Sequence, residues 1–442
     1  MPMTNTMEVM VMKKEKVKVG IMGFGVVGTG TYRVLKENFH IIRSQIGADV
    51  VVEKILVKDL SKKRAVAVPE ELLTTNPDDI LENPEIDIVV ELMGGEEPAY
   101  SYIDKAFSNG KHVVTANKEL MAKKGSLILQ KADEKGLALG FEASVCGGIP
   151  IIRAFKRSLC TDKVSRIMGI VNGTTNYILT KMAQEGSDYD EALKEAQENG
   201  YAEADPTADV EGYDAAYKMA ILASIGFHTK VNINLVSREG ISGICKRDIE
   251  YGKDLGWTIK LLGIAQEIDG KLEVGVSPVM LPSEHPLALI NGVNNAVFVN
   301  SDAVGELMFY GPGAGQMATG NSVASDIIET ARQIVLGNEM LPNCSCFESK
   351  EILEELESSF YIRLDVINKP GVLAKIAAVF GDFGVSLESV LQKKTEGESA
   401  EIVWITSKVQ ENSFRKAIEC IKKLDVVNEV SSIIRVEANG MS

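Results

Sequence analysis

Residues 16–28 read KVKVGIMGFGVVG, and this stretch decides the fold of the first third of the chain. A short apolar strand runs into Gly23-x-Gly25-x-x-Gly28, and the residues after it have a helical pattern. Between a strand and a helix, such glycines allow a tight turn and let the backbone approach a pyrophosphate at the helix N-terminus. The spacing therefore predicts a dinucleotide-binding site, and a glycine-rich turn without a ligand is the alternative.

Strands and helices alternate along the chain that follows. Strands are predicted at 50–57, 86–92, 112–115 and 137–141, with helices at 98–109 and 119–135. This alternation is typical of a parallel, doubly wound sheet of the Rossmann type, so the chain belongs to the α/β class. We assign this domain to residues 16–144. A helix at 321–336, capped by Asn321 or Ser322, is expected to return to it as part of a segment 321–340.

From residue 145 on, the predicted strands and helices no longer alternate regularly. Residues 145–320 contain strands at 164–171, 274–280 and 295–301 among long helical and irregular stretches, which predicts a second, α+β domain. Residues 341–357 have the composition of a linker. Residues 358–437 follow the order βαββαβ, a ferredoxin-like sandwich. Residues 1–15 are expected to form a loose leader.

Composition and charge exclude several classes of protein. The chain has 442 residues, of which 45% are apolar and 25% charged, with 47 basic against 62 acidic residues. A net charge of −15 argues against a nucleic-acid partner, which needs a clustered basic surface. No stretch approaches the length of a membrane span, and the N-terminus lacks the order of a signal peptide. Six scattered cysteines, including Cys344-x-Cys346 with the wrong spacing for a metal site, favour a reducing cytoplasm.

The end of the second strand bears on the choice of nicotinamide cofactor. NAD-specific folds place an acid there for the ribose hydroxyls, whereas a basic group suits the phosphate of NADP. Lys58 occupies this position, and three further cations follow within six residues. The pattern favours NADP, although Asp59 keeps NAD possible. A solvated face of lysines is the alternative interpretation.

Thr115-Ala116-Asn117-Lys118 follows another predicted strand. Ligands bind outside the carboxyl ends of strands in such sheets, so Lys118 can contact the cofactor or the substrate. A capping asparagine beside a surface lysine explains the same letters. A glycine-rich segment at 311–320, GPGAGQMATG, can likewise bring its amides close to a ligand, or it can serve as a hinge.

Residues 198–218 place six carboxylates before one lysine on a predicted helix. Asp214 and Lys218 are separated by four residues and therefore share one face of that helix. An exposed pair of this kind is worth only about 0.3–0.5 kcal/mol. The apolar run after Lys218 indicates a largely buried helix, however, and a buried lysine held by an aspartate is a candidate proton donor or acceptor.

Taken together, these segments resemble homoserine dehydrogenase. The matching stretches are GFGVVG at 23–28, TANK at 115–118, EASVCGGIP at 142–150, VNGTTNYIL at 171–179, YAEADPTADVEGYDAAYK at 201–218 and GPGAGQMATG at 311–320. The tail, starting with YIRLDVINKPGVLAKIAAVF, resembles an ACT domain, which is a module that senses small molecules. The resemblance implies a substrate-binding and dimerisation role for residues 145–320.

The resemblance implies a reaction and roles for individual residues. The family reduces L-aspartate 4-semialdehyde to L-homoserine with NAD(P)H, in the biosynthesis of threonine, methionine and isoleucine. Lys218 is the implied general acid and Asp214 orients the substrate beside it. Glu203 or Asp209 is expected to hold the substrate ammonium group, and Lys118 to lie by the nicotinamide and the reacting oxygen. The implied cofactor-binding residues are Gly23, Phe24, Gly25, Val26, Val27, Gly28, Lys58, Thr115, Lys118 and Gly315.

The family also implies an ion, an effector and an assembly. A monovalent cation, normally Na⁺, is expected at Glu142 and at the backbone carbonyls of Val145, Gly147 and Ile149. L-Threonine is the expected inhibitor, acting through the tail, and a tail that serves only to join subunits is the alternative. Such tails pair across subunits, which implies a homodimer or homotetramer. The expected effector contacts are Asn368, Gly371, Val372, Leu373 and Gln392.

Two alternatives from other functional classes remain. Cys146 follows the dinucleotide domain, so it can be the nucleophile of a semialdehyde dehydrogenase that acts through a thioester. That chemistry needs a base, and no histidine lies near Cys146 in sequence. A non-catalytic amino-acid sensor is the second alternative, and it requires a degraded site, whereas Asp214, Lys218, Glu203 and Lys118 are all present.

Overall fold

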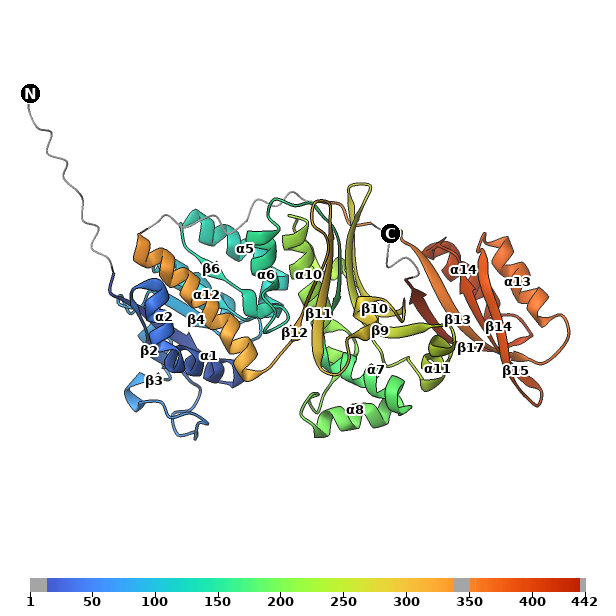
Figure 1. The fold of residues 1–442 in the computed structure, drawn as a ribbon, viewed down its shortest axis with the longest axis horizontal. Helices are drawn as coiled ribbons and strands as arrows, with labels where there is room; N and C mark the ends of the chain where they lie inside the picture. Colours follow the sequence, from blue (N-terminus) through green and yellow to red (C-terminus); the bar gives the residue numbers. More distant parts are fainter. Residues whose placement is uncertain (1–13, 338–349, 354, 438–442) are drawn as a thin grey trace, which may run out of the picture. The chain divides into compact units, whose positions relative to one another are not determined.

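The computed structural model describes residues 14–337, 350–353 and 355–437. These residues form two compact units (Figure 1). The first contains the chain up to Ser158 and the segment from Pro312 to the end of the returning helix, and the second contains Leu159–Gly311 and the chain from residue 350 onward. Most of the predicted leader and linker, with Cys344 and Cys346, lies outside the described residues.

The first unit is built on a six-stranded sheet in which every pair of neighbouring strands is parallel. The strand order is β3-β2-β1-β4-β5-β6, so β2 and β3 lie on one side of β1 and β4 to β6 lie on the other. This confirms the doubly wound sheet and places its switch point at the carboxyl ends of β1 and β4, where ligands bind in such folds. The strands are β1 (Lys16–Met22), β2 (Asp49–Leu56), β3 (Leu73–Thr74), β4 (Ile88–Glu91), β5 (His112–Thr115) and β6 (Leu139–Gly140).

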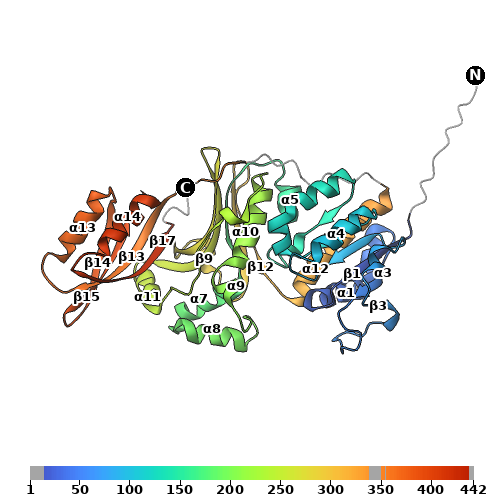
Figure 2. The same cartoon turned by 180° about the vertical axis from the view of Figure 1, so that it is seen from behind.

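Helices cover both faces of this sheet. On one face lie α1 (Val26–Glu37), α2 (Phe39–Ile46) and the returning α12 (Gln316–Leu336) (Figure 1). On the other lie α3 (Asp78–Leu81), α4 (Ala99–Ser108) and α5 (Lys118–Glu134) (Figure 2). The short helices of this unit are η1 (Glu70–Leu72), η2 (Glu142–Ser144), α6 (Ile151–Arg153) and the π-turn η3 (Ala154–Ser158).

The returning helix begins earlier than predicted. Its N-cap is Gly315, with φ +125°, rather than Asn321 or Ser322. Residues 316–320 are helical because they pack directly against α1. A Cβ added to Gly30 would lie 1.8 Å from the carbonyl oxygen of Gln316, and one added to Gly320 would lie 2.5 Å from the carbonyl carbon of Gly30. Glycine at both positions lets the two backbones touch, and this close packing outweighs the poor helix propensity of glycine.

The second unit contains an eleven-stranded sheet whose main path runs β12-β11-β7-β9-β10-β17-β13-β15-β14. Predictions of strands near β7, β10 and β11 are confirmed, whereas β9 and β12 were not predicted. The first six strands are β7 (Val164–Ile170), β8 (Ser237–Arg238), β9 (Trp257–Ile268), β10 (Lys271–Pro282), β11 (Asn294–Ser301) and β12 (Gly305–Pro312). The helices before the tail are α7 (Gly173–Glu185), α8 (Tyr189–Glu198), α9 (Thr207–Val210), α10 (Tyr213–Gly226), η4 (Ile233–Leu235), α11 (Lys246–Asp254) and η5 (Pro286–Leu289).

The C-terminal part of the second unit has the predicted βαββαβ order. Its core contains Trp404 and Phe380, with Phe360 stacked on Phe414 at a centroid distance of 3.8 Å. A two-residue strand, β16, is the addition to the predicted order. The elements are β13 (Glu357–Ile367), α13 (Val372–Asp382), β14 (Leu387–Glu396), β15 (Ser399–Thr406), β16 (Val409–Gln410), α14 (Glu411–Ile421) and β17 (Val427–Val436).

This C-terminal module is joined through the backbone to residues 159–311 of the same unit. Val279 and Met280 of β10 pair in parallel with Arg435 and Val436 of β17. The two sheets are therefore one continuous sheet, whereas the sequence suggested a separate unit. Residue 352 adds a second connection, because it forms a parallel bridge to Leu272 at the start of β10.

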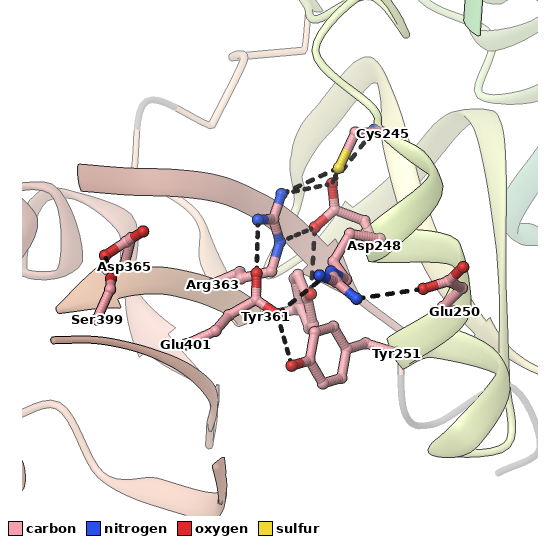
Figure 3. Close-up of polar contacts among 10 residues, drawn as sticks. Cys245, Asp248, Glu250, Tyr251, Tyr361, Arg363, Asp365, Ser399 and Glu401 are labelled. Atoms are coloured by element: carbon pink, nitrogen blue, oxygen red, sulfur yellow. Dashed lines mark hydrogen bonds and ion pairs between the residues drawn. The ribbon is translucent and has the colours of Figure 1, made fainter. Parts of the chain in front are cut away.

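A buried polar cluster joins the same two parts (Figure 3). Asp248 of α11 has a fully buried side chain and accepts hydrogen bonds from Arg363 Nε at 2.8 Å and from the Tyr361 hydroxyl at 3.1 Å. Arg363 also donates to Glu401 at 3.0 Å, and Glu401 accepts from the Tyr251 hydroxyl at 2.6 Å. Removal of one partner from such a buried pair costs about 3–5 kcal/mol. The cluster therefore fixes α11 to the face of the C-terminal sheet.

Candidate active site

The glycine-rich turn leaves room for a ligand at the N-terminus of α1. Gly28 must be glycine because its Cβ would lie 2.3 Å from the carbonyl oxygen of Gly23. Gly23 has φ +103° and lies against the carbonyl of Leu92 in the loop after β4. Gly25, the N-cap of α1, has nothing within 4 Å of its Cβ position. The turn thus has an open position next to unpaired helix amides, as an anion site requires.

The predicted cofactor-binding residues of the first unit surround this position. Val26 is 65% exposed, although it is apolar, and Phe24 and Val27 are partly buried beside it. Gly315 begins α12, whose first turn packs against Gly30 of α1. The structure therefore brings the two glycine-rich segments together within one unit.

The loop after β2 exposes the side chain of Lys58. Asp59 turns back on its own loop and accepts hydrogen bonds from the hydroxyl and amide of Ser61 at 2.7 and 2.8 Å. These hydrogen bonds lower the pKa of Asp59. The guanidinium of Arg64 bonds to the backbone carbonyls of the same loop, including that of Asp59 at 2.7 Å. The loop is thus ordered with its lysines facing outward.

Thr115, which is predicted to line the cofactor, lies at the carboxyl end of β5. Its side chain is buried, donates to Glu91 at 2.6 Å and accepts from the amide of Asn117 at 3.1 Å. The hydroxyl therefore faces inward, and only the backbone of Thr115 can contact a ligand. Asn117 caps α5 through Leu120, as the alternative interpretation had it, and Lys118 is exposed at the first position of that helix.

Glu91 is a buried residue that sequence reasoning missed. Its second carboxylate oxygen accepts from the amide of Met93 at 2.8 Å, so it shapes the loop between β4 and α4. This loop lies against the glycine-rich turn, because Gly23 contacts Leu92. A carboxylate at the end of an otherwise apolar strand was the signal available in the sequence.

The segment 142–149 of the first unit is buried and negatively charged. Glu142 accepts hydrogen bonds from the amides of Ile152 and Arg153, both at 2.8 Å. Burial and the nearby Asp326 raise the pKa of Glu142 to about 7. Burial also raises the pKa of Asp326 to about 6, although this residue pairs with Arg153 at 2.9 Å. The Arg153 guanidinium pairs with Asp326 and with Glu329, whereas the Glu142 carboxylate contacts the backbone amides of 152 and 153.

The other residues of this segment are packed inside the unit. Val145, Cys146 and Ile149 are buried, and the carbonyl of Gly147 accepts from the Ser322 hydroxyl at 2.7 Å. Cys146 is 0% exposed, so a substrate carbonyl has no access to its sulfur. This burial argues against the thioester alternative, because a nucleophile must reach the substrate.

The predicted pair on the second unit is formed and buried. Lys218 Nζ donates to Asp214 Oδ2 at 2.7 Å, one helical turn apart on α10. The same ammonium group donates to the carbonyl of Val171 at 2.7 Å, at the end of β7. Both side chains are buried, which excludes the interpretation as a solvated surface pair. The pair is held by one strand end and one helix.

Two residues at the N-terminus of α7, the N-cap Asn172 and Thr174 of the first turn, complete this arrangement, and neither was predicted to take part. Asn172 donates to Asp209 at 2.7 Å and to Asp214 at 2.9 Å. Thr174 donates to the carbonyl of Tyr201 at 2.7 Å and to Asp209 at 3.3 Å. The signal was the N-cap pattern of an asparagine directly before a helix.

The remaining predicted residues, apart from Val372, are exposed. Glu203 lies in the loop between α8 and α9 with its side chain in solvent. In the C-terminal module, Asn368, Leu373 and Gln392 are exposed, whereas Val372 is buried in the module core. Gly371 is the N-cap of α13 with φ +89°, so the loop before it presents the first amides of that helix.

The arrangement on α10 suits proton transfer to an oxygen. A desolvated ammonium group with a fixed carboxylate partner can donate a proton while it stabilises developing negative charge. Within the described residues, no group of three or more His, Cys, Asp and Glu side chains is placed to hold a metal ion. In the same part of the chain, no helix is both long and apolar enough to cross a bilayer.

Comparisons with known proteins agree with this geometry. Residues 150–328 match the family homoserine dehydrogenase, residues 23–142 match its NAD binding domain, and residues 360–426 match the ACT domain. A homoserine dehydrogenase of Bacillus subtilis is 46% identical over 430 residues, which cover 96% of this chain and 99% of that protein. The chain belongs to the homoserine dehydrogenase family.

Solved structures of the family have the same fold. A homoserine dehydrogenase from Thiobacillus denitrificans has a TM-score of 0.91 at 40% identity, and the match covers 96% of this chain and 99% of that one. A hyperthermophilic archaeal homoserine dehydrogenase mutant, in complex with NADPH, has a TM-score of 0.62 at 29% identity over 74% of this chain and 99% of that one. The resemblance stated from the sequence is thus confirmed along nearly the whole chain.

The two glycines of the turn give a contrast that tests nucleotide binding. Gly25→Ala places a methyl group in open space, so we expect a loss of at most about 1 kcal/mol in stability from the weaker cap but at least a tenfold weaker affinity for NADPH. Gly28→Ala forces the methyl group onto a backbone carbonyl and should cost about 1–3 kcal/mol or more. Urea unfolding and NADPH fluorescence titration measure the two effects. Wild-type affinity in Gly25→Ala would contradict the site.

Proposed function

We propose that the chain catalyses the reversible NAD(P)H-dependent reduction of L-aspartate 4-semialdehyde to L-homoserine. The observation that carries this proposal is the buried Lys218 ammonium group held by Asp214 and the Val171 carbonyl. The reduced nicotinamide supplies the hydride when bound. Lys218 gives its proton to the oxygen on which negative charge develops, and the resulting neutral amine accepts a proton from the hydroxyl in the reverse direction.

The carboxylates around the pair suit an amino-acid substrate. The carboxylates of Asp209 on α9 and Asp214 on α10 contact the N-cap residue of α7, and Glu203 lies in the loop before α9. We assign Glu203 or Asp209 to the substrate ammonium group and Asp214 to orientation of the substrate beside Lys218. On the first unit, the exposed Lys118 at the start of α5 is assigned to the nicotinamide and the reacting oxygen.

NADP is the proposed cofactor, and NAD remains the alternative. The outward-facing Lys58 supports NADP, since Asp59 is held by its own loop. The archaeal relative, whose structure contains NADPH, is consistent with this choice. The nucleotide would be held by the open turn at Gly25 and by the start of α12.

Replacement of Lys218 tests the proposed acid. Lys218→Met should lower kcat by about 10²–10⁴-fold, because proton transfer by a positioned group contributes that much. The matched control is Lys181→Met, which removes a partly exposed lysine of α7 that is paired to Glu185 at 2.6 Å with the same helical spacing and to Glu195 at 3.0 Å. The control should stay within twofold of wild type. Initial rates of homoserine oxidation with NADP and with NAD measure both effects and the cofactor preference.

A monovalent cation, proposed to be Na⁺, fits the segment around Glu142. The residues that would hold it are Glu142 and the carbonyls of Val145, Gly147 and Ile149. Burial and the neighbouring Asp326 disfavour the ionised form of Glu142, and a bound cation would supply the missing counter-charge. Bound oxygen ligands of this type suit a hard cation, whose role here is to hold the segment together.

The cation can be tested through stability. If the cation binds only the folded chain, the thermal midpoint should be higher in NaCl than in choline chloride at equal ionic strength. At a cation concentration of one hundred times Kd, the free energy of unfolding should increase by about 2.7 kcal/mol. Glu142→Gln should abolish this difference. Equal midpoints in the two salts for the wild-type protein would exclude the site, and the same series with KCl distinguishes the two ions.

The C-terminal module is proposed to bind L-threonine and to inhibit the enzyme. The exposed loop Asn368–Leu373 and Gln392 offer polar contacts and helix amides to a free amino acid. The cluster of Asp248, Arg363 and Glu401 supports regulation, because it ties this module to α11 of the catalytic part. A module that only joins subunits is the second candidate role.

We expect L-threonine to lower the rate of homoserine oxidation by the full-length chain. Asn368→Ala and Gln392→Ala should raise the half-inhibitory concentration at least tenfold and leave the uninhibited rate unchanged. Lys416→Ala, on the exposed face of α14, is the control and should respond as wild type does. An absence of any threonine effect on the wild-type protein would leave the module with a role in assembly.

A homodimer or homotetramer is proposed for the chain. The edge strand β12 has exposed apolar side chains, with Met308 at 41% and Tyr310 at 56% exposure. At the other edge of the sheet, Val390 of β14 is 42% exposed. Apolar edge strands of this kind are normally covered by another chain.

The cytoplasmic location stays a prediction from composition.

A further inference from the structure

Asn172 occupies a central position that the proposed chemistry has not used. It is 5% exposed and lies at the N-cap of α7, directly after the residue whose carbonyl accepts from Lys218. Its side-chain amide donates to Asp209 Oδ1 of α9 and to Asp214 Oδ2 of α10. One amide group therefore connects three helices at the proposed site of proton transfer.

The orientation of this amide is fixed by its partners. The Asn172 carbonyl oxygen accepts from the amide of Thr175 at 2.9 Å and from its hydroxyl at 3.0 Å, and both are donors. The NH₂ group faces two carboxylates, which are acceptors when ionised. A flipped amide would place its oxygen against both carboxylates, so the contacts allow only one orientation. The side-chain oxygen thus caps α7, and the NH₂ group binds the two carboxylates.

The contact with Asp214 is shared with the catalytic pair. Asp214 Oδ2 accepts from Asn172 at 2.9 Å and from Lys218 at 2.7 Å. Two donors from different elements on one oxygen fix the direction of the carboxylate, and they stabilise its ionised form. The N-terminus of α7, a thirteen-residue helix, adds favourable potential for negative charge at the same place.

We propose that Asn172 is a positioning residue for the reaction. It holds Asp209 and Asp214 at a fixed separation, and through Asp214 it aims the Lys218 ammonium group. A neutral amide is needed because it donates to two carboxylates without adding charge. A serine could cap the helix but could not reach both acids, and an aspartate would add a third negative charge. This inference rests on the proposed role of Lys218.

Other charged groups near α7 lie farther along the helix. Lys260 of β9 contacts Asn176, and Glu195 of α8 contacts Tyr177. The titratable groups in direct contact with the Asn172 side chain are Asp209 and Asp214, with Lys218 one hydrogen bond away. Replacement of Asn172 by an acid should therefore give a response to pH that comes from this group of carboxylates.

Two variants of Asn172 in the full-length protein test the inference. Asn172→Ser keeps a good helix cap but loses the bridge, so we expect kcat to fall about 10–100-fold with the KM for NADPH unchanged. Asn172→Asp should be more impaired at pH 8 and recover at least fivefold relative to wild type at pH 6, where a proton shared by three carboxylates restores one donated hydrogen bond. Thr175→Val removes the two hydroxyl contacts on the capping side but keeps the hydrogen bond from its backbone amide to the Asn172 side-chain oxygen, so the bridge to both acids remains and kcat should stay at the wild-type value.

The outcomes separate this inference from the proposed function. If Lys218→Met is inactive while Asn172→Ser keeps wild-type kcat, the inference is overturned and the proposed function stands. If Lys218→Met is fully active, the assignment of Lys218 as the acid is wrong. Crystal structures of Asn172→Ser then test the positioning role of Asn172. Displaced carboxylates of Asp209 and Asp214 would support the positioning role, and unchanged carboxylates would overturn it. Equal losses of kcat in Asn172→Ser and Thr175→Val would show a purely structural cap.

Discussion

The proposed site on the second unit depends on the buried positive charge of Lys218. Lys218 is taken out of water and is stabilised by the carboxylate of Asp214 and the carbonyl of Val171. A charge in such a place is tolerated only when its partners are held in position, and loss of one partner costs about 3–5 kcal/mol. The end of β7, the cap of α7 and the face of α10 are therefore constrained together. The polar residues of 171–218 lie close together because the buried ammonium group of Lys218 is stable only beside polar partners.

The C-terminal module shares a sheet with the catalytic part, and this affects how regulation can work. The pairing of β10 with β17 and the Asp248–Arg363 contact leave little freedom for independent movement. A ligand on the module can change activity only through its differential affinity for two states of this connected structure. Helix α11, which carries Asp248, packs against α7, and α7 begins at the site. The physical connection between the two ends of the unit is thus short.

Local patterns in the sequence predicted much of the fold and part of the site. The Gly23–Gly28 turn, the βαββαβ tail and the spacing of Asp214 and Lys218 each depend on neighbouring residues, and all three are confirmed as structure. The start of α12 was misplaced because close packing of Gly30 and Gly320 overrides helix propensity. Asn172 and Glu91 were missed because their partners lie on other elements. Such long-range contacts leave no periodic signal in the sequence.

The late positions of α12 and β17 in the sequence have a consequence for folding during synthesis. Helix α12 closes the unit begun by β1, and β17 completes a sheet whose strand β10 was made some 150 residues earlier. Neither unit can finish folding in the order in which the ribosome delivers it. A prematurely ended polypeptide exposes an open sheet edge, which is a marker for chaperones and proteases. The topology thus makes the completion of both units depend on segments that are synthesised late.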